Sequence, residues 1–133
     1  MGILDRNSLL REASRRLSEA QVVPPNLRGL ARELSGGNQQ KLVVERAIAR
    51  KKPLLVCFHP TRGVDLASQR SIHQKIKEQV AMNTAVLVLS SDLSELRQLC
   101  HRILVIRSGT IVGEFSTDAT DMELGVAMTG ALA

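Results

Sequence analysis

Two short apolar runs on either side of a helical stretch constrain the fold of this 133-residue chain most strongly. Leu54–Phe58 and Ala85–Leu89 are continuous apolar runs of strand length, and the intervening residues 67–82 have helical spacing. Unbroken apolar runs predict strands buried on both faces of a parallel sheet. Strand, helix and strand in this order predict a βαβ unit, and therefore an α/β fold.

The rest of the chain continues the alternation of helices and strands. Apolar side chains at helical spacing predict a helix over residues 6–20, after which Pro24 and Pro25 break regular structure. Ser35 is a good N-cap for a helix that continues to about Arg50. The later predicted elements are a short helix over residues 94–100, a hairpin of residues 103–106 and 110–115, and a small helix over residues 120–128.

Composition excludes several classes of function. The net charge is +5, but aromatic residues make up only 2% of the chain, so side chains that stack on bases are scarce and we expect no nucleic-acid partner. The apolar runs are too short to span a bilayer, which predicts a cytoplasmic protein. Neither the two cysteines nor the three histidines form a cluster at metal-ligand spacing, and we expect no metal site. His73 and His101 are expected on helix or loop surfaces.

The strongest motif is the octapeptide Leu34-Ser35-Gly36-Gly37-Asn38-Gln39-Gln40-Lys41. A hydroxyl, two glycines that let backbone amides approach closely, and the positive end of a helix dipole together favour an anion. The simpler interpretation is an ordinary serine-capped helix after a Gly-Gly turn, which is much commoner in proteins than a phosphate site.

The octapeptide resembles the extended signature of ABC-transporter ATP-binding proteins that serve sugar and nucleoside importers. The resemblance continues through residues 60–65, 85–92, 106–112 and 123–130, which are similar to the segment before the D-loop, the switch strand, the late hairpin and the tail. It implies an incomplete P-loop NTPase (ABC ATPase) domain: a parallel sheet core with helices and a C-terminal hairpin. Residues 1–133 would form one partial domain, in which residues 1–34 end the helical subdomain.

The resemblance also implies a site shared between two domains. Ser35, Gly36, Gly37 and Gln39 would contact ATP held on a second ATP-binding domain, with the Ser35 hydroxyl donated to the γ-phosphate. Asp65, at the D-loop position, would cross the same interface, although it is also a plain N-cap for the helix that begins at Leu66. The other implied partners are Mg²⁺ and transmembrane permease subunits, which would hold the protein at the inner face of the cell membrane.

Three positions depart from the family pattern. Where an active member has an Asp that supports Mg²⁺ and a Glu that polarises water, this chain has Phe58 and His59, and the switch position is Ser91 instead of His. We therefore expect no intact catalytic residue at these positions. The chain alone is not expected to hydrolyse ATP.

The phosphate-binding pattern GxxxxGK[ST] does not occur in the sequence. Only Gly125 and Gly130 have the required separation, and Ala131 and Leu132 stand where Lys and Ser or Thr are needed. The expectation is therefore a truncation product, an expressed fragment or a degraded gene. The predicted function is the C-terminal portion of an importer ATPase that contributes its signature motif to a composite ATP site. A non-catalytic interaction module and an orphan fragment without activity remain the alternatives.

Overall fold

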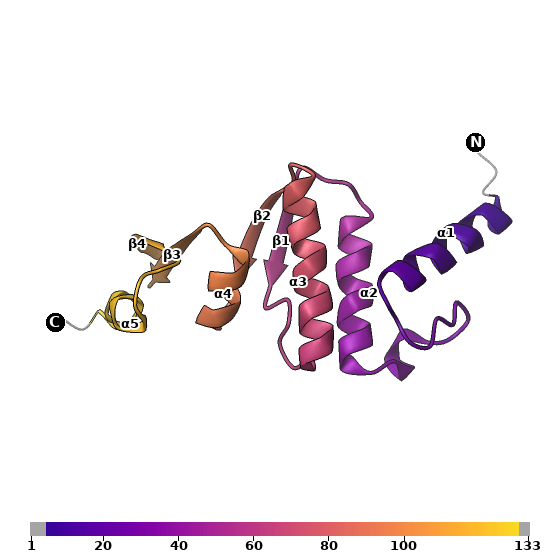
Figure 1. Cartoon of the computed structure of the whole chain (residues 1–133), viewed down its shortest axis with the longest axis horizontal. Coiled ribbons are helices and arrows are strands. Elements are labelled where there is room, and N and C mark those ends of the chain that lie inside the picture. The colour runs from indigo at the N-terminus through magenta and orange to yellow at the C-terminus, as the bar shows by residue number, and fades with distance from the viewer. Residues whose placement is uncertain (1–4, 131–133) are drawn as a thin grey trace. The chain divides into compact units, whose positions relative to one another are not determined.

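The computed structural model describes residues 5–130 and has an α/β order of elements (Figure 1). The chain divides into two compact units, one up to Leu87 and one from Val88, and each is considered by itself. The assignment of residues 1–34 to a helical subdomain stays a prediction. In chain order the elements are α1 (Arg6–Glu19), the 3-10 helix η1 (Ala31–Glu33), α2 (Gly36–Ile48), β1 (Leu54–Phe58), α3 (Leu66–Ala81), β2 (Ala85–Leu89), α4 (Leu93–Leu99), β3 (Arg102–Arg107), β4 (Thr110–Ser116) and α5 (Asp121–Thr129).

The first unit contains the predicted βαβ arrangement up to Leu87, which lies within β2. β1 and β2 form a two-stranded parallel sheet, and α3 connects them. α2 and α3 pack side by side and begin at the same end of the pair, as Figure 1 shows. Val44 of α2 and Ile72 and Ile76 of α3 are buried in this unit. The α/β fold with a parallel sheet is therefore confirmed.

The expectation that both strands are buried on both faces is wrong. Exposure alternates along β1: Cys57 is buried, whereas Leu54, Val56 and Phe58 are 53%, 55% and 71% exposed. Leu87 of β2 is 49% exposed. The apolar pattern of a strand records which residues can be buried, but burial itself requires a second layer of structure on that face. Among residues 5–130, no layer encloses these side chains.

A buried carboxylate connects the three helices of the first unit. Glu45 on α2 is 5% exposed, and its two oxygens lie 3.4 Å from Arg16 Nη1 of α1 and 3.0 Å from Lys75 Nζ of α3. Arg16 also pairs with Glu12 at 2.7 Å on its own helix. A buried charge needs such partners, because an unpaired carboxylate in this position would lose its hydration without compensation. Glu45 thus fixes α1 and α3 against α2.

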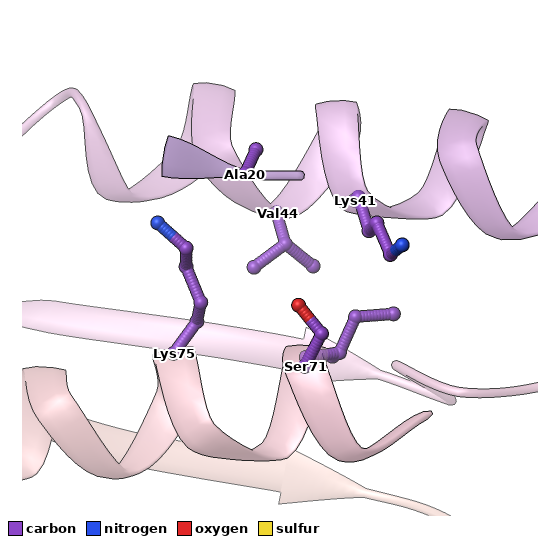
Figure 2. A pocket seen from close by; sticks show the side chains of 6 residues that line it. Ala20, Lys41, Val44, Ser71 and Lys75 are labelled. Carbon is purple, nitrogen blue, oxygen red and sulfur yellow. The ribbon is translucent and has the colours of Figure 1, made fainter. Parts of the chain in front are cut away.

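A small hollow lies near this ion pair (Figure 2). Ala20, Lys41, Val44, Ser71, Ile72 and Lys75 line it. Lys41 donates to the carbonyl of Gln21 at 3.3 Å, and Lys75 is engaged with Glu45. The hollow has no room for a water-sized molecule, so it is a gap in packing and not a ligand site.

The second unit is a hairpin covered by α5. β3 and β4 pair antiparallel from Arg102 opposite Ser116 to Arg107 opposite Thr110, with one irregularity after Val105. Ser108 and Gly109 both have positive φ (49° and 78°), as a two-residue turn with the twist of a hairpin requires. The buried core of this unit is Leu96, Ile103, Val105 and Leu124. The predicted hairpin is confirmed.

Two local features differ from the sequence expectations. The 3-10 helix Ala31–Glu33 was not predicted. The Glu33 side chain caps its start by accepting a hydrogen bond from the Leu30 amide at 3.2 Å. His73, expected at a surface, is 6% exposed on the inner side of α3.

In the part of the chain that the structure describes, no helix combines the length and apolar character needed to cross a membrane.

Candidate functional site

The predicted signature motif lies at the N-terminal end of α2. Ser35 is the N-cap, and its Oγ accepts a long hydrogen bond of 3.4 Å from the amide of Asn38. Gly36 and Gly37 form the start of the first turn, which contains no acidic side chain. This end of the helix therefore carries the partial positive charge of the helix dipole with no acidic residue of its own, although the Asp65 carboxylate at the start of α3 lies against Gly37. Ser35 and Gly36 are exposed, so the end is open to a ligand or partner.

Gly37 is buried because it lies against the start of α3. A Cβ atom at this position would be 2.5 Å from Ser68 Oγ and 3.0 Å from Asp65 Oδ2. A real Cβ does not tolerate a contact of 2.5 Å, so only glycine permits α2 and α3 to approach this closely here. The sequence favoured this glycine for contact with an anion. The structure adds a packing role for the same residue.

Asp65 caps α3 with both carboxylate oxygens. Oδ1 accepts from the Ser68 amide at 2.9 Å, and Oδ2 accepts from the Ser68 hydroxyl at 2.8 Å. These bonds, the backbone one first, hold the pKa of Asp65 below its ordinary value of 3.8. The capping role that the sequence left open for Asp65 is therefore confirmed, and its carboxylate is ionised at neutral pH.

The three polar side chains that follow the glycines point to different partners. The Asn38 side chain donates to the carbonyl of Val23 at 2.6 Å and accepts from the backbone amide of Val23 at 3.2 Å. Gln39, a predicted nucleotide-binding residue, donates to the carbonyl of Leu34 at 2.9 Å and so closes the turn before the helix. Gln40 donates to the carbonyl of Pro60 at 2.7 Å. Sequence reasoning assigned no role to Asn38 or Gln40 individually, because their partners are 15 and 20 residues away in the chain.

The end of β1 has no carboxylate at the two positions that depart from the pattern. Phe58 is 71% exposed, and its ring meets the His59 ring edge to face, with centroids 4.6 Å apart. His59 has a left-handed backbone (φ 45°), which is uncommon for a residue other than glycine. Phe58 offers no oxygen to a cation. Within residues 5–130, no group of three or more His, Cys, Asp and Glu side chains is placed to hold a metal ion.

The structure brings several of the predicted residues of the first unit together. Ser35, Gly36 and Gly37 lie beside Asp65 through the contact of Gly37 with the Asp65 carboxylate. Phe58 and His59 are linked to the same region because Pro60, the next residue, accepts the Gln40 hydrogen bond. Ser91 is an exposed residue after β2 in the second unit. The candidate site is thus a surface formed by two helix ends.

Comparison with known proteins gives a consistent result. No family model matches the chain. The chain is 38% identical over 131 residues to the guanosine import ATP-binding protein NupO of Bacillus subtilis. This alignment covers 98% of the chain and 26% of NupO. It is 37% identical to the ribose import ATP-binding protein RbsA 1 of Streptomyces coelicolor, over 97% of the chain and 26% of that protein. The chain spans about a quarter of the length of these curated relatives.

Solved structures agree on the fold. The dimeric structure of MJ0796, a bacterial ABC transporter cassette, superposes with a TM-score of 0.75 at 23% identity, over 90% of this chain and 52% of that one. The ABC transporter cassette MJ1267 gives a TM-score of 0.70 at 20% identity, over 97% of this chain and 49% of that one. The structure thus corresponds to about half of a single cassette. This chain is therefore a homologue of part of the ATP-binding proteins of ABC importers for sugars and nucleosides, with the fold of part of an ABC ATPase cassette.

Proposed function

We propose that this chain presents the Ser35 end of α2 to the phosphates of ATP bound on a second ATP-binding domain, as part of an importer for simple sugars or nucleosides. The observation that carries the proposal is the exposed N-terminus of α2, which has no acidic side chain in its first turn and whose serine hydroxyl accepts a long hydrogen bond of 3.4 Å. Backbone amides, a hydroxyl and a helix dipole directed at one point bind an anion.

The names of the relatives support a role in ATP binding for import. NupO and RbsA 1 are named for ATP-binding roles in guanosine and ribose import. A structure of MJ0796 that shares the fold at a TM-score of 0.75 is a dimer bound to ADP and phosphate. In the proposed assembly, Ser35 donates its hydroxyl to the terminal phosphate, the amides of Gly36 and Gly37 face the same oxygens, and Asp65 contacts the partner across the interface. Gln39 acts indirectly by closing the turn that carries Ser35.

Magnesium is assigned to the partner domain in this proposal. The residues of this chain fit the ion poorly, since Phe58 provides no oxygen ligand and His59 is a nitrogen donor, whereas Mg²⁺ prefers oxygen ligands. The chain's own contribution is to orient the phosphates and to exclude water from one side of them. It lacks a carboxylate at the end of β1 to activate water, so it does not hydrolyse ATP on its own.

A binding assay with a complete relative tests the proposal. The intact chain, labelled with a fluorophore at its N-terminus, is titrated with NupO in three conditions. These are no nucleotide, ADP, and an ATP analogue whose terminal phosphate cannot be cleaved. We expect binding only with the analogue, because only it places a terminal phosphate at the interface.

Two variants with the same change in charge identify the contact. Ser35→Asp keeps a good N-cap but brings a carboxylate to the phosphates, so we expect at least about a tenfold loss of affinity. Ser8→Asp adds the same charge to the exposed first turns of α1 and should leave the affinity unchanged. Equal binding with and without nucleotide would instead favour a non-catalytic interaction module, and no binding under any condition would contradict the proposal.

A further inference from the structure

The beginning of α2 contacts the segment between β1 and α3 at three points along one face. The carbonyl of Gly63 lies 4.0 Å from the Cβ position of Gly36, the Asp65 carboxylate lies 3.0 Å from the Cβ position of Gly37, and Pro60 accepts the hydrogen bond of Gln40. Positions 36, 37 and 40 share a helix face, because residues three and four apart are neighbours on an α-helix. The segment is therefore attached at its beginning, its middle and its end.

Gln40 supplies the directional contact among the three. Its Nε2 lies 2.7 Å from the Pro60 oxygen, Gln40 is partly buried and Pro60 is buried. A buried carbonyl that loses its donor loses a hydrogen bond that water does not readily replace. This contact therefore holds the segment at the point where it leaves β1.

The backbone hydrogen bonds within the segment are long: 3.2 Å from the Arg62 amide to the His59 carbonyl and 3.4 Å from the Val64 amide to the Thr61 carbonyl. His59 and Gly63 both have left-handed backbones, with φ of 45° and 74°. A short segment with weak internal bonds takes its order from what it is attached to. Asp65 stands at the end of this segment, so its position depends on the attachment as well as on its own bonds to Ser68 of α3.

We propose that Gln40 is a positioning residue that holds Ser35 and Asp65 in one fixed arrangement, so that the two helix ends meet a partner-bound nucleotide as a single surface. This inference rests on the proposed function and extends it to a residue that contacts no ligand. Without the Gln40 bond, the Asp65 segment would have to be ordered when the partner binds, and that ordering lowers affinity.

Substitutions of matched length separate this role from general stability. Gln40→Met keeps the size and helix propensity of glutamine but cannot donate a hydrogen bond, whereas Gln40→Lys restores a donor. Gln74 is an exposed glutamine on α3 that donates to Glu78 at 3.1 Å, so Gln74→Met and Gln74→Lys control for the loss of a donor and for the added charge.

Two measurements are made on each variant of the full chain. Hydrogen exchange reports the order of the backbone amides of residues 61–66, and titration with NupO and the uncleavable ATP analogue reports affinity. For Gln40→Met we expect faster exchange in residues 61–66 and weaker nucleotide-dependent binding, each by about three- to tenfold, as the loss of one hydrogen bond implies. Exchange in the β3–β4 hairpin should stay unchanged, Gln40→Lys should restore both values, and the Gln74 variants should match the unchanged chain.

Unchanged exchange in residues 61–66 of Gln40→Met would overturn the inference, because the segment would then not depend on Gln40. Faster exchange with unchanged affinity would also overturn it, since the order of the segment would then not matter to binding. Failure of the unchanged chain to bind NupO with the analogue would contradict the proposed function, and the inference would fall with it. The exchange data distinguish that case, because they report the attachment of the segment without any partner.

Discussion

α2 and α3 begin side by side, but their two N-terminal ends are capped in opposite ways. At α3, both oxygens of the Asp65 carboxylate are used by Ser68, at 2.9 and 2.8 Å. At α2, the neutral hydroxyl of Ser35 accepts one bond of 3.4 Å. A carboxylate at the N-cap offsets the helix dipole more than a serine hydroxyl does. The α2 end has no carboxylate of its own, and the nearest one described is that of Asp65, whose Oδ2 lies 3.0 Å from the Cβ position of Gly37.

The difference indicates how the two ends divide their roles. The α3 end stabilises its own helix, and its negative charge does not favour a phosphate. The α2 end has a weaker cap, and Ser35 and Gly36 at this end are exposed. An exposed helix N-terminus of this kind favours an external anion. Gly37 brings the two ends into contact, so any ligand at one end meets the edge of the other.

The largest expected effect comes from separating the two ends. Gly37→Ala places a Cβ 2.5 Å from Ser68 Oγ, so either the Ser68 and Asp65 side chains shift and strain their hydrogen bonds, or α2 and α3 move apart. We expect the variant to unfold more easily by about 1–3 kcal/mol, as is usual for overpacking. Urea denaturation followed by circular dichroism measures this change.

A second glycine provides the control. Gly125 lies within α5 with nothing within 4 Å of its Cβ position, so Gly125→Ala should stabilise the chain by about 0.5–1 kcal/mol through helix propensity alone. Adding Ser68→Ala to Gly37→Ala removes the closest atom and should recover part of the loss. Stabilisation by Gly37→Ala, as at Gly125, would contradict the close packing.

The next largest expected loss of stability comes from removal of the α3 cap. Asp65→Ala leaves the Ser68 amide and hydroxyl without the acceptor that they share, so we expect the thermal midpoint to fall by clearly more than in Ser35→Ala. Differential scanning fluorimetry of the two variants in one buffer makes the comparison. An equal fall in both would mean that the two caps are not energetically different.

Acid distinguishes the carboxylate from a neutral cap. The pKa of Asp65 is lowered by its bonds to Ser68, so its charge stabilises the fold fully above its ordinary pKa of 3.8. That contribution is lost as the pH falls through the lowered value. Asp65→Asn keeps a good N-cap without a titrating group, so the stability advantage of the unchanged chain should shrink from pH 6 to pH 3. Urea midpoints across this range measure it, and a constant difference would argue against the shift.

The smallest expected change in stability comes from the α2 cap. Ser35→Ala removes a single long hydrogen bond, so we expect a loss of about 0.5 kcal/mol, at the low end for an N-cap. The urea midpoint measures it. A loss of about 2 kcal/mol would show that Ser35 is needed for its own helix, and would weaken the case that its hydroxyl is available to a ligand.

Local signals in the sequence were enough to predict most of the elements. Ser35, Asp65 and the apolar runs each act through neighbours within a few residues, and the structure has α2 from Gly36, α3 from Leu66 and β1 at Leu54–Phe58. The turn at Ser108 and Gly109 is equally local. The order of elements in an α/β fold follows from such signals because each helix or strand is largely determined by its own periodicity.

Contacts between distant residues were not predictable in the same way. Gln40 could face any of several neighbours, and only the packing of α2 on the segment after β1 selects Pro60. The exposure of Val56 and Phe58 depends on what covers the sheet, which an apolar pattern does not specify. The roles of Ser35, Gly36, Gly37, Gln39 and Asp65 toward a nucleotide stay predictions.

The two-residue turn at Ser108 and Gly109 has a consequence for folding kinetics. β3 and β4 are adjacent in the chain, so their pairing requires closure of only a very short loop, and isolated hairpins of this kind form in about 1–10 μs. The Glu45 ion pairs instead join residues 29 and 30 positions apart, to Arg16 and Lys75, and contacts of greater sequence separation form more slowly. In a refolding experiment, the hairpin should therefore acquire protection before the three-helix arrangement around Glu45.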